Sequence, residues 1–201
     1  MKQIIAIDID DTLAESTETL RKLVNQRLGV DLTSEDYAVE GEYWGYYERV
    51  WAMHDLQDVR YKDMISEMAV DQSYVPLLPS AQYAIDTLSD TYDIVLITSR
   101  DAQWESATRR WLKQHFPGKE IDLYFTDSHR DASKMSKGQL CQQLGAYLLI
   151  DDNVEHCESA LACGVDAILF GHYGWNRANS ELRRCQGWPD VLEFVGEQPR
   201  L

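Results

Sequence analysis

The stretch that decides the fold is IIAIDIDDTLAES, residues 4–16, in which an apolar run meets three carboxylates within four positions. The run from Gln3 to Ile9 stays apolar up to the acidic residues instead of alternating with polar ones, which is typical of a strand buried on both faces of a parallel sheet. Asp8, Asp10 and Asp11 would then stand where this first strand ends. Carboxylates next to a buried strand are costly unless they are paired, so the sequence predicts that they bind something.

Further apolar runs follow along the chain and alternate with stretches of helical spacing. The runs lie at Asp93–Ile97, Tyr147–Ile150 and Ala167–Phe170, with a weaker one at Ile121–Phe125. Helices are predicted between and after them at Ser80–Leu88, Trp104–Phe116, Lys137–Leu144 and Val154–Cys163, the last followed by Gly164 as a helix C-cap. This alternation predicts the α/β class with a doubly wound parallel sheet.

The residues from Ala14 to Val75 break the alternation because they contain no convincing strand. Apolar residues at helical spacing instead predict helices over Ser16–Leu28, Glu42–His54 and Leu56–Val70. Pro76 and Pro79 mark the return to the α/β pattern. We therefore expect a core domain of residues 1–13 and 76–201, with a small helical cap domain, residues 14–75, inserted after the first strand.

Polar residues that can carry chemistry stand at the ends of the other predicted strands. Thr98, Ser99 and Arg100 follow the second run, Asp151 and Asp152 follow the run at Tyr147–Ile150, and Lys137 opens the helix before it. Ligands of open parallel sheets bind beyond the carboxyl ends of the strands, so these residues are expected to meet the acidic triplet. Converging carboxylates suit Mg²⁺, while a hydroxyl at Thr98 and an ammonium at Lys137 suit a phosphate.

Four motifs, each at the end of its predicted element, resemble those of the haloacid dehalogenase superfamily of phosphohydrolases. They are DIDDT (residues 8–12), ITSR (97–100), Lys137 and LLIDD (148–152), and together they span the predicted core. Within the superfamily, the chain looks most like the 5′(3′)-deoxyribonucleotidase and nucleotidase branch, whose helical cap is inserted after the first motif. TRRWLKQHFP, GHYGWNR and GWPDVLEFV also resemble that branch, although Gly174 stands where it more often has proline.

The resemblance implies catalytic and metal-binding roles for four aspartates. Asp8 would be the nucleophile that forms an aspartyl phosphate, and Asp10 would be the general acid and base. The Asp8 carboxylate, the Asp10 backbone carbonyl and the pair of Asp151 and Asp152 would hold Mg²⁺. The sequence leaves open which member of the pair touches the metal; we favour Asp152, with Asp151 acting through water.

The remaining motif residues are expected to bind the transferred phosphoryl group. The resemblance assigns this role to Thr98, to the backbone of Ser99 and to Lys137, with Lys134 as the alternative lysine. Lys137 is preferred because it heads the helix before LLIDD. For Asp11 we expect no chemical role, only a turn-forming contact of its side chain.

The implied activity is that of a Mg²⁺-dependent phosphomonoesterase, a nucleotidase acting on a small phosphate monoester such as a nucleoside monophosphate; the resemblance also suggests a homodimer. Two alternatives share the fold: a 3′-phosphatase acting on nucleic-acid ends, and a phosphate-binding or interaction protein without turnover. Lys and Arg number 19 against 34 Asp and Glu, a net charge of −15 with no basic cluster, which disfavours long nucleic acid as a partner. The presence of Asp10 favours turnover.

The cysteines, the apolar runs and the aromatic residues give weaker indications. The four cysteines form no CxxC pair and are predicted to be reduced, and no run reaches the roughly 18 apolar residues of a membrane span, so we expect a cytoplasmic protein with no membrane partner.

The predicted cap contains Tyr43, Trp44, Tyr46, Tyr47 and Trp51. Trp44, Tyr47 and Trp51 share a helical face and are expected in the core, whereas Tyr43 and Tyr46 are candidates to stack on a base. The histidines show no ligand spacing and are expected to be surface or hydrogen-bonded residues.

Overall fold

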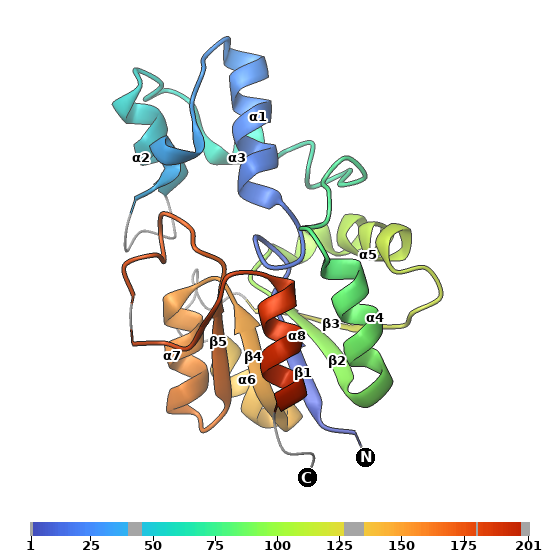
Figure 1. The fold of residues 1–201 in the computed structure, drawn as a ribbon. Coiled ribbons are helices and arrows are strands. Elements are labelled where there is room, and N and C mark those ends of the chain that lie inside the picture. The colour runs from blue at the N-terminus through green and yellow to red at the C-terminus, as the bar shows by residue number, and fades with distance from the viewer. Residues whose placement is uncertain (1, 40–45, 127–134, 180, 198–201) are drawn as a thin grey trace.

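The fold is a six-stranded sheet with helices on both faces, as a computed structural model shows (Figure 1). The structure describes residues 2–39, 46–126, 135–179 and 181–197. Its strands are β1 (Ile4–Ile7), β2 (Asp93–Thr98), β3 (Asp122–Phe125), β4 (Ala146–Asp151), β5 (Asp166–Phe170) and β6 (Arg184–Cys185), in the order β3-β2-β1-β4-β5-β6 and all parallel. The predicted doubly wound α/β class is confirmed. The strand β6 was not predicted, because two residues carry no readable period.

Successive residues of the central strands face opposite sides of the sheet, and both sides are covered. Ile5 and Ile7 of β1 belong to one core cluster, whereas Ala6 belongs to another. The first cluster includes residues of α4 (Ala81–Thr91), α5 (Glu105–His115) and α8 (Trp188–Glu197), and the second includes residues of α6 (Lys137–Leu144) and α7 (Val154–Ala162). Burial on both faces explains why the strand runs are continuously apolar. The helix α8 was not predicted.

The strand order places β1 between β2 and β4, so that the carboxyl ends of these three strands meet. Asp8 directly follows β1, Thr98 closes β2 and Asp151 closes β4. The strand predicted to reach Ile9 stops at Ile7 because the chain folds back there: the N–H groups of residues 13 and 14 both donate to the Ile9 carbonyl, at 2.9 and 2.8 Å. This turn holds the acidic triplet at the edge of the sheet where ligands of such folds bind.

The inserted segment, residues 14–75, lies beyond the carboxyl ends of the strands (Figure 1). It contains α1 (Ser16–Leu28), a 3-10 turn at Ser34–Tyr37, α2 (Tyr46–Met53) and α3 (Tyr61–Met64). The chain leaves and re-enters the core through two adjacent backbones, because the Leu78 N–H donates to the Leu13 carbonyl at 2.8 Å and the Glu15 N–H to the Pro76 carbonyl at 3.0 Å. Both ends of the segment are therefore fixed beside the acidic triplet.

The helices of the inserted segment agree with the sequence in part. The structure gives α1 the predicted bounds, and α2 lies within the predicted Glu42–His54, whose first residues are outside the described ranges. The helix predicted over Leu56–Val70 is wrong, since only Tyr61–Met64 is helical there. Asp55 adopts a positive φ of 61°, and the Glu48 carboxylate accepts the Tyr61 N–H at 2.8 Å, so a new short helix begins at that point.

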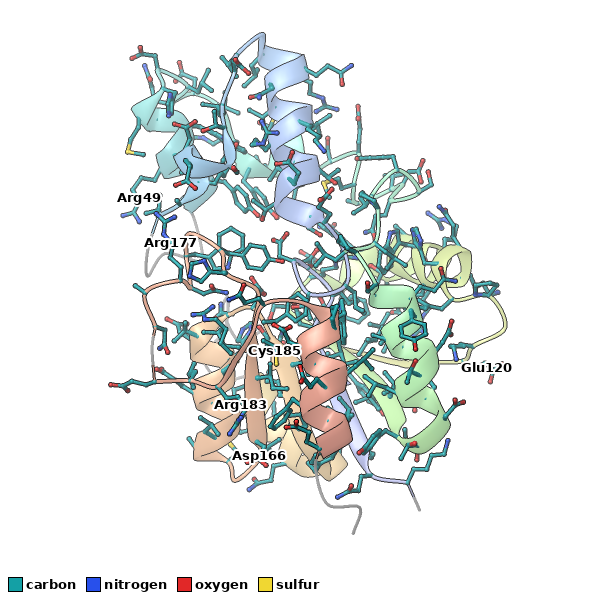
Figure 2. The ribbon with its side chains drawn as sticks, in the orientation of Figure 1. Arg49, Glu120, Asp166, Arg177, Arg183 and Cys185 are labelled. Atoms are coloured by element: carbon teal, nitrogen blue, oxygen red, sulfur yellow. The ribbon has the colours of Figure 1, made fainter. Side chains whose placement is uncertain are left out.

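The loop after β5 contacts the inserted segment and closes one side of the molecule. Arg177 of this loop forms an ion pair with Glu35 at 3.3 Å (Figure 2). A Cβ atom at Gly174 would lie 2.0 Å from the Cα of Ala38, so only glycine permits this approach. A proline at this position, which the resemblance to the nucleotidase branch led us to expect, would bring such a Cβ and could not lie this close to Ala38.

The state of the cysteines agrees with the prediction of reduced, structural thiols. All four cysteines are free, and Cys141, Cys157 and Cys185 are buried, as structural thiols are. Among the helices in the described part of the chain, none combines the length and the apolar character that crossing a membrane requires.

Candidate active site

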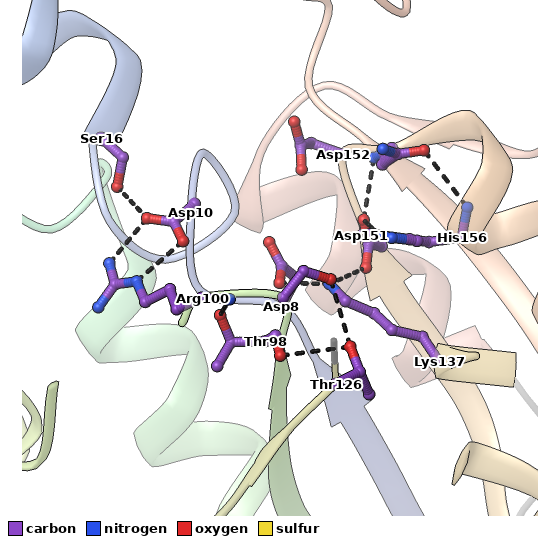
Figure 3. Close-up of polar contacts among 12 residues, drawn as sticks. Asp8, Asp10, Ser16, Thr98, Arg100, Thr126, Lys137, Asp151, Asp152 and His156 are labelled. Atoms are coloured by element: carbon purple, nitrogen blue, oxygen red, sulfur yellow. Dashed lines mark hydrogen bonds and ion pairs between the residues drawn. The ribbon is translucent and has the colours of Figure 1, made fainter. Parts of the chain in front are cut away.

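Lys137 stands at the centre of a buried group of charges at the carboxyl edge of the sheet. Its side chain is 1% exposed, and its Nζ donates to Asp8 Oδ1 at 2.5 Å and to Asp151 Oδ2 at 2.7 Å (Figure 3). The helix α6 begins at Lys137 because Ser136 caps it, accepting the Gln139 N–H at 3.2 Å. The lysine preferred from the sequence thus joins two predicted aspartates; Lys134 lies outside the described residues.

The carboxylates of Asp8, Asp151 and Asp152 converge, with ligand oxygens within 4.8 Å of one another, and all three residues are buried. We call these three and Lys137 the strand-end cluster. Asp152 Oδ2 accepts the Trp175 indole N–H at 2.8 Å, whereas its buried Oδ1 has no hydrogen-bond partner among the residues that the structure describes. Burial raises the pKa of Asp8 to about 8 although Lys137 opposes this, and burial with the charge of Asp151 raises the pKa of Asp152 well above its usual range. With all three carboxyl groups ionised, the cluster would carry more negative charge than Lys137 balances, and the raised pKa values of Asp8 and Asp152 follow from this and from their burial.

Both oxygens of Asp151 are already occupied by protein donors. Besides Lys137 at Oδ2, its Oδ1 accepts the Asn153 N–H at 3.0 Å and contacts His156 Nδ1 at 3.1 Å. Burial alone would raise the pKa of Asp151, but the charge of Lys137, followed by the charge that His156 carries at the acidic pH where Asp151 titrates, outweighs burial and lowers the pKa. Burial and Lys137 lower the pKa of His156, so the imidazole is neutral near pH 7 and donates through Nδ1.

His156 is a site residue that was not predicted. It lies one turn into α7, whose N-cap Asn153 accepts the backbone N–H groups of Glu155 and His156. The signal in the sequence is the cap itself: an Asn directly after the acidic pair starts a helix that turns the residue at position 156 back toward Asp151.

Thr98 is buried at the end of β2 with its hydroxyl held in place. Its Oγ1 accepts the Arg100 N–H at 3.1 Å, and its carbonyl accepts the Thr126 N–H at 2.8 Å. Ser99 is half-buried, and its Oγ lies 3.2 Å from Thr126 Oγ1. Because Thr98 Oγ1 accepts one bond, its hydrogen can still be donated to a ligand. Thr126, which was not predicted, fixes the ends of β2 and β3 against each other.

Asp10 is held apart from the strand-end cluster by Arg100 (Figure 3). The guanidinium donates through Nε to Asp10 Oδ2 at 2.8 Å and through Nη2 to Oδ1 at 2.7 Å, and Ser16 Oγ donates to Oδ1 at 2.5 Å. Burial would raise the pKa of Asp10, but the charge and hydrogen bonds of Arg100 outweigh burial and lower it. Arg100 was noted in the ITSR motif without a role, and its pairing with Asp10 was not predicted.

Asp11 binds the helix that opens the inserted segment instead of closing a local turn. It adopts a positive φ of 53°, and its carboxylate accepts the Thr17 N–H at 3.0 Å and the Thr17 hydroxyl at 2.5 Å. Burial raises the pKa of Asp11 to about 7 against these hydrogen bonds. The expected turn-forming contact is thus replaced by one that satisfies an N–H group in the first turn of α1.

Two stacked rings of the loop after β5 border the acidic residues. Tyr173 and Trp175 have ring centroids 4.6 Å apart, and the Tyr173 hydroxyl donates to the Asp11 carbonyl at 2.7 Å. Asn176 Nδ2 donates to the carbonyls of Asp152 and Phe170, at 2.9 and 3.0 Å. The Trp-Asn pair, noted in the sequence only for its resemblance, therefore holds Asp152 by both its side chain and its backbone.

The aromatic residues of the inserted segment pack largely among themselves. Trp51 is fully buried, and its indole N–H donates to the Tyr37 hydroxyl at 2.7 Å. Tyr47 stacks on Tyr61 with a centroid distance of 5.0 Å. Tyr43, Trp44 and the side chain of Tyr46, which were also named from the sequence, lie outside the described residues.

Comparison with known proteins assigns the chain to a family. The family model described as 5′ nucleotidase, deoxy (pyrimidine), cytosolic type C protein matches residues 2–198. The chain belongs to this family. It is therefore a hydrolase of the phosphatase and nucleotidase type, as the four motifs indicated. No curated protein sequence matches the chain.

Solved structures show the same fold at low sequence identity. A haloacid dehalogenase-like protein from Agrobacterium tumefaciens matches with a TM-score of 0.67 and 14% identity, covering 98% of both chains. A haloacid dehalogenase-family hydrolase from Deinococcus radiodurans, solved with bound phosphate and sodium, matches with a TM-score of 0.64 and 15% identity over 98% of this chain and 96% of that one. A hydrolase from Pseudomonas syringae matches with a TM-score of 0.61 and 16% identity over 98% and 99%.

Proposed function

We propose that the protein is a Mg²⁺-dependent phosphomonoesterase that hydrolyses a small phosphate monoester, a nucleoside monophosphate by preference, through an aspartyl phosphate at Asp8. The observation that carries this proposal is the strand-end cluster, in which three buried carboxylates face one ammonium. One of their oxygens, Asp152 Oδ1, has no partner within the described parts of the chain. A divalent cation would balance the charge of such a site, and all-oxygen donors favour Mg²⁺.

The donors present fit a hard divalent cation. The carboxylates of Asp8 and Asp152, with the backbone carbonyl of Asp10, would hold it, while Asp151 would act through water because both its oxygens are taken. When bound, Mg²⁺ would neutralise charge on the phosphoryl oxygens. The single free oxygen of Asp152 supports the choice of Asp152 over Asp151 as the direct ligand.

The first half of the reaction transfers the phosphoryl group to the protein. An Asp8 oxygen attacks phosphorus in line, the bond from phosphorus to the leaving oxygen breaks, and Asp10, which has to take up a proton beforehand because Arg100 lowers its pKa, gives that proton to the leaving oxygen. Lys137, the Thr98 hydroxyl and the Ser99 backbone N–H would bind the phosphoryl oxygens as charge shifts among them. The buried position of Lys137 strengthens its attraction for a phosphate dianion.

The second half releases phosphate. The Asp10 carboxylate formed in the first half takes a proton from water, the water oxygen attacks phosphorus, and the bond from phosphorus to the Asp8 oxygen breaks. Inorganic phosphate leaves, and Asp8 and Asp10 return to their starting states. Asp10 serves in both halves because its protonation state alternates between them.

The inserted segment supports a small substrate. It lies over the edge of the sheet that carries the strand-end cluster, and we infer that it acts as a cap domain that limits access of water and of large ligands (Figure 1). The net charge of −15 disfavours polyanions, which argues against a 3′-phosphatase on nucleic-acid ends. The homodimer implied by the resemblance and the cytoplasmic location expected from the cysteines and the apolar runs stay predictions.

The test is a screen of phosphomonoesters with Mg²⁺, scored by kcat/KM and repeated with the Asp8→Asn variant. We expect turnover of nucleoside monophosphates that requires Mg²⁺ and falls by roughly 10⁴-fold or more in Asp8→Asn. Asp11→Asn is the matched control, because it makes the same change three residues away in a carboxylate without a chemical role. Retained turnover in Asp8→Asn would refute the nucleophile, and preference for a phosphorylated oligonucleotide would favour the 3′-phosphatase.

A further inference from the structure

One buried charge near the site has no part in the mechanism above. The Arg100 side chain is 3% exposed, yet it stands beside Asp10, the proposed acid and base. Its guanidinium forms two parallel hydrogen bonds with the two oxygens of Asp10. This fork geometry fixes the plane of a carboxylate as well as its position, which a single contact does not do.

The other donors of Arg100 are bound to protein groups, so little of the guanidinium is left for a substrate. Its Nη1 donates to Gln72 Oε1 at 2.7 Å and to Thr108 Oγ1 at 3.1 Å. With the two bonds to Asp10, four of its five N–H groups are used. Gln72 and Thr108 are themselves buried, at 2% and 0% exposure. Arg100 is thus built into the interior and faces Asp10 from there.

The inserted segment also contacts Asp10, and part of the Asp10 carboxylate remains exposed. Ser16, the first residue of α1, donates to Oδ1 of Asp10, and the side chain of Asp10 is 26% exposed. Figure 3 shows the contact of Ser16 with Asp10. Gln72, near the other end of the same segment, accepts a hydrogen bond from Arg100, so both ends of the segment contact the pair of Asp10 and Arg100. The exposed side of the carboxylate is the side available to a substrate.

We propose that Arg100 is the positioning residue for Asp10: supported by Gln72 and Thr108, it holds the carboxylate where it meets the leaving oxygen. The inference rests on the proposed function, since it assigns a role within that reaction. Without the fork, Asp10 would rotate about its side-chain bonds and spend less time in the reactive position. The loss would be confined to steps that Asp10 serves.

Leaving groups of different basicity separate this role from a merely structural one. The alkoxide released from a nucleoside monophosphate needs a proton from Asp10, whereas dinitrophenolate leaves without one. We would therefore compare Arg100→Met, Arg100→Lys and Asp10→Asn on a nucleoside 5′-monophosphate and on 2,4-dinitrophenyl phosphate, with Mg²⁺. First-turnover rates would be measured by rapid quench, so that slow hydrolysis of the aspartyl phosphate does not hide the first step.

We expect both Arg100 variants to lose about 10²-fold or more in kcat/KM on the nucleotide and less than about 10-fold in the first turnover of the dinitrophenyl ester. Arg100→Lys should rescue little, because an ammonium keeps the charge but cannot form the fork. The double variant Asp10→Asn with Arg100→Met should be no slower on the nucleotide than Asp10→Asn alone, since Arg100 acts through Asp10.

Equal losses on both esters, full rescue by lysine or additive losses in the double variant would each overturn the proposal. If the Arg100 variants do not fold, Thr108→Val provides the test, because it removes one hydrogen-bond partner of Arg100 at nearly constant side-chain volume. It should show the same dependence on the leaving group, with a smaller loss of activity on the nucleotide. A Thr108→Val protein with no selective loss on the nucleotide would equally refute the role. Failure of the wild-type protein to hydrolyse either ester would count against the proposed function instead.

Discussion

Two groups of carboxylates at the carboxyl edge of the sheet have different partners in the fold. In the strand-end cluster, Asp8, Asp151 and Asp152 share the single charge of Lys137, and one oxygen of Asp152 has no partner. In the loop that follows β1, Asp10 and Asp11 both accept hydrogen bonds from protein donors. We call Asp10 and Asp11 the loop pair; the first is bound by Arg100 and the second by Thr17.

This difference indicates that the strand-end cluster binds a ligand, whereas the loop pair fixes the position of the chain. An unmatched buried carboxylate costs folding free energy, so a site that retains one must recover that free energy on binding. Carboxylates that already accept hydrogen bonds from protein donors can instead fix the position of the segments they contact. In the loop pair those contacts run to the start of α1 through Ser16 and Thr17. The strand-end cluster should therefore respond to cations, and the loop pair should not.

The largest expected effect is that of removing the only cation in the strand-end cluster. Lys137→Met should lower kcat/KM by about 10³-fold or more, because the ammonium is the proposed counter-charge for the phosphoryl group. It should also lower the free energy of unfolding by about 3 to 5 kcal/mol in the absence of divalent cations, since two carboxylates lose their partner. Chemical denaturation with EDTA present measures the second effect.

The matched control is Lys134→Met, the other lysine that the sequence offered for this role. We expect it to leave both quantities near the wild-type values. If Lys134→Met were the more damaging change, the ammonium between Asp8 and Asp151 would not be the one that matters, and the contrast between the two groups would lose its basis.

The next prediction separates the two adjacent aspartates of the cluster. Asp152→Asn should reduce Mg²⁺ affinity at least about 10-fold while making the metal-free protein more stable, because it removes the least balanced charge. Asp151→Asn should instead destabilise the metal-free protein, because Lys137 loses one of its two carboxylates. Calorimetric titration with Mg²⁺ and thermal melts measure both. Stability changes of the same sign in the two variants would contradict this division.

A smaller effect is expected from pH on the metal-free protein. The pKa of Asp8 is raised to about 8, and that of Asp152 is raised as well, so the folded state holds protons that the unfolded chain has lost. Stability contributed in this way is complete below the unfolded pKa of about 4 and is lost as pH rises through the folded values. The melting temperature in EDTA should therefore fall between pH 6.5 and 8.5.

The pH range in that experiment avoids groups that act in other directions. Asp10 and Asp151 have lowered pKa values and lose their contribution only in acid, and His156, whose pKa is also lowered, opposes the trend only below its unfolded value of about 6.5. Added Mg²⁺ should raise the melting temperature more at pH 8.5 than at 6.5, because it keeps the cluster ionised. A metal-free melting temperature that rises over this range would show that the cluster is not short of positive charge.

The strand-end cluster and the loop pair also differ in how well the sequence predicts them. Asp8, Thr98, Lys137 and Asp151 each stand at the end of a strongly patterned strand or helix, and a parallel sheet brings such ends together whatever the details of packing. The strand-end cluster was therefore predictable as a set. The free oxygen of Asp152 was not, because periodicity places a residue at an edge without giving the direction of its side chain.

The contacts of the loop pair were beyond prediction for a different reason. Arg100 is 90 positions from Asp10 in the sequence, and Tyr173 is 162 positions from Asp11. The local spacing of residues therefore predicts neither contact. The prediction of a helix over Leu56–Val70 was wrong for the same reason: a contact between distant residues, from a side chain of α2, fixes where α3 begins. In this molecule local pattern predicts the sheet and its edge, while the inserted segment and its attachment depend on distant partners.

The smallest effect is expected at Asp11, where the loop pair can be tested without touching the chemistry. Asp11→Asn should change kcat/KM by less than about threefold, because asparagine tolerates the positive φ and keeps an oxygen for the Thr17 N–H. At pH 8 the variant should be slightly more stable than the wild type, since it removes a buried carboxyl whose pKa is about 7. Asp11→Ala, in contrast, should cost about 2 kcal/mol, because it strains the backbone and leaves the N–H of α1 unpaired. Parallel denaturation curves at pH 6 and pH 8 measure all three proteins. A large catalytic loss in Asp11→Asn would mean that the acidic triplet works as one unit, and the separation between a cluster for ligands and a pair for structure would have to be abandoned.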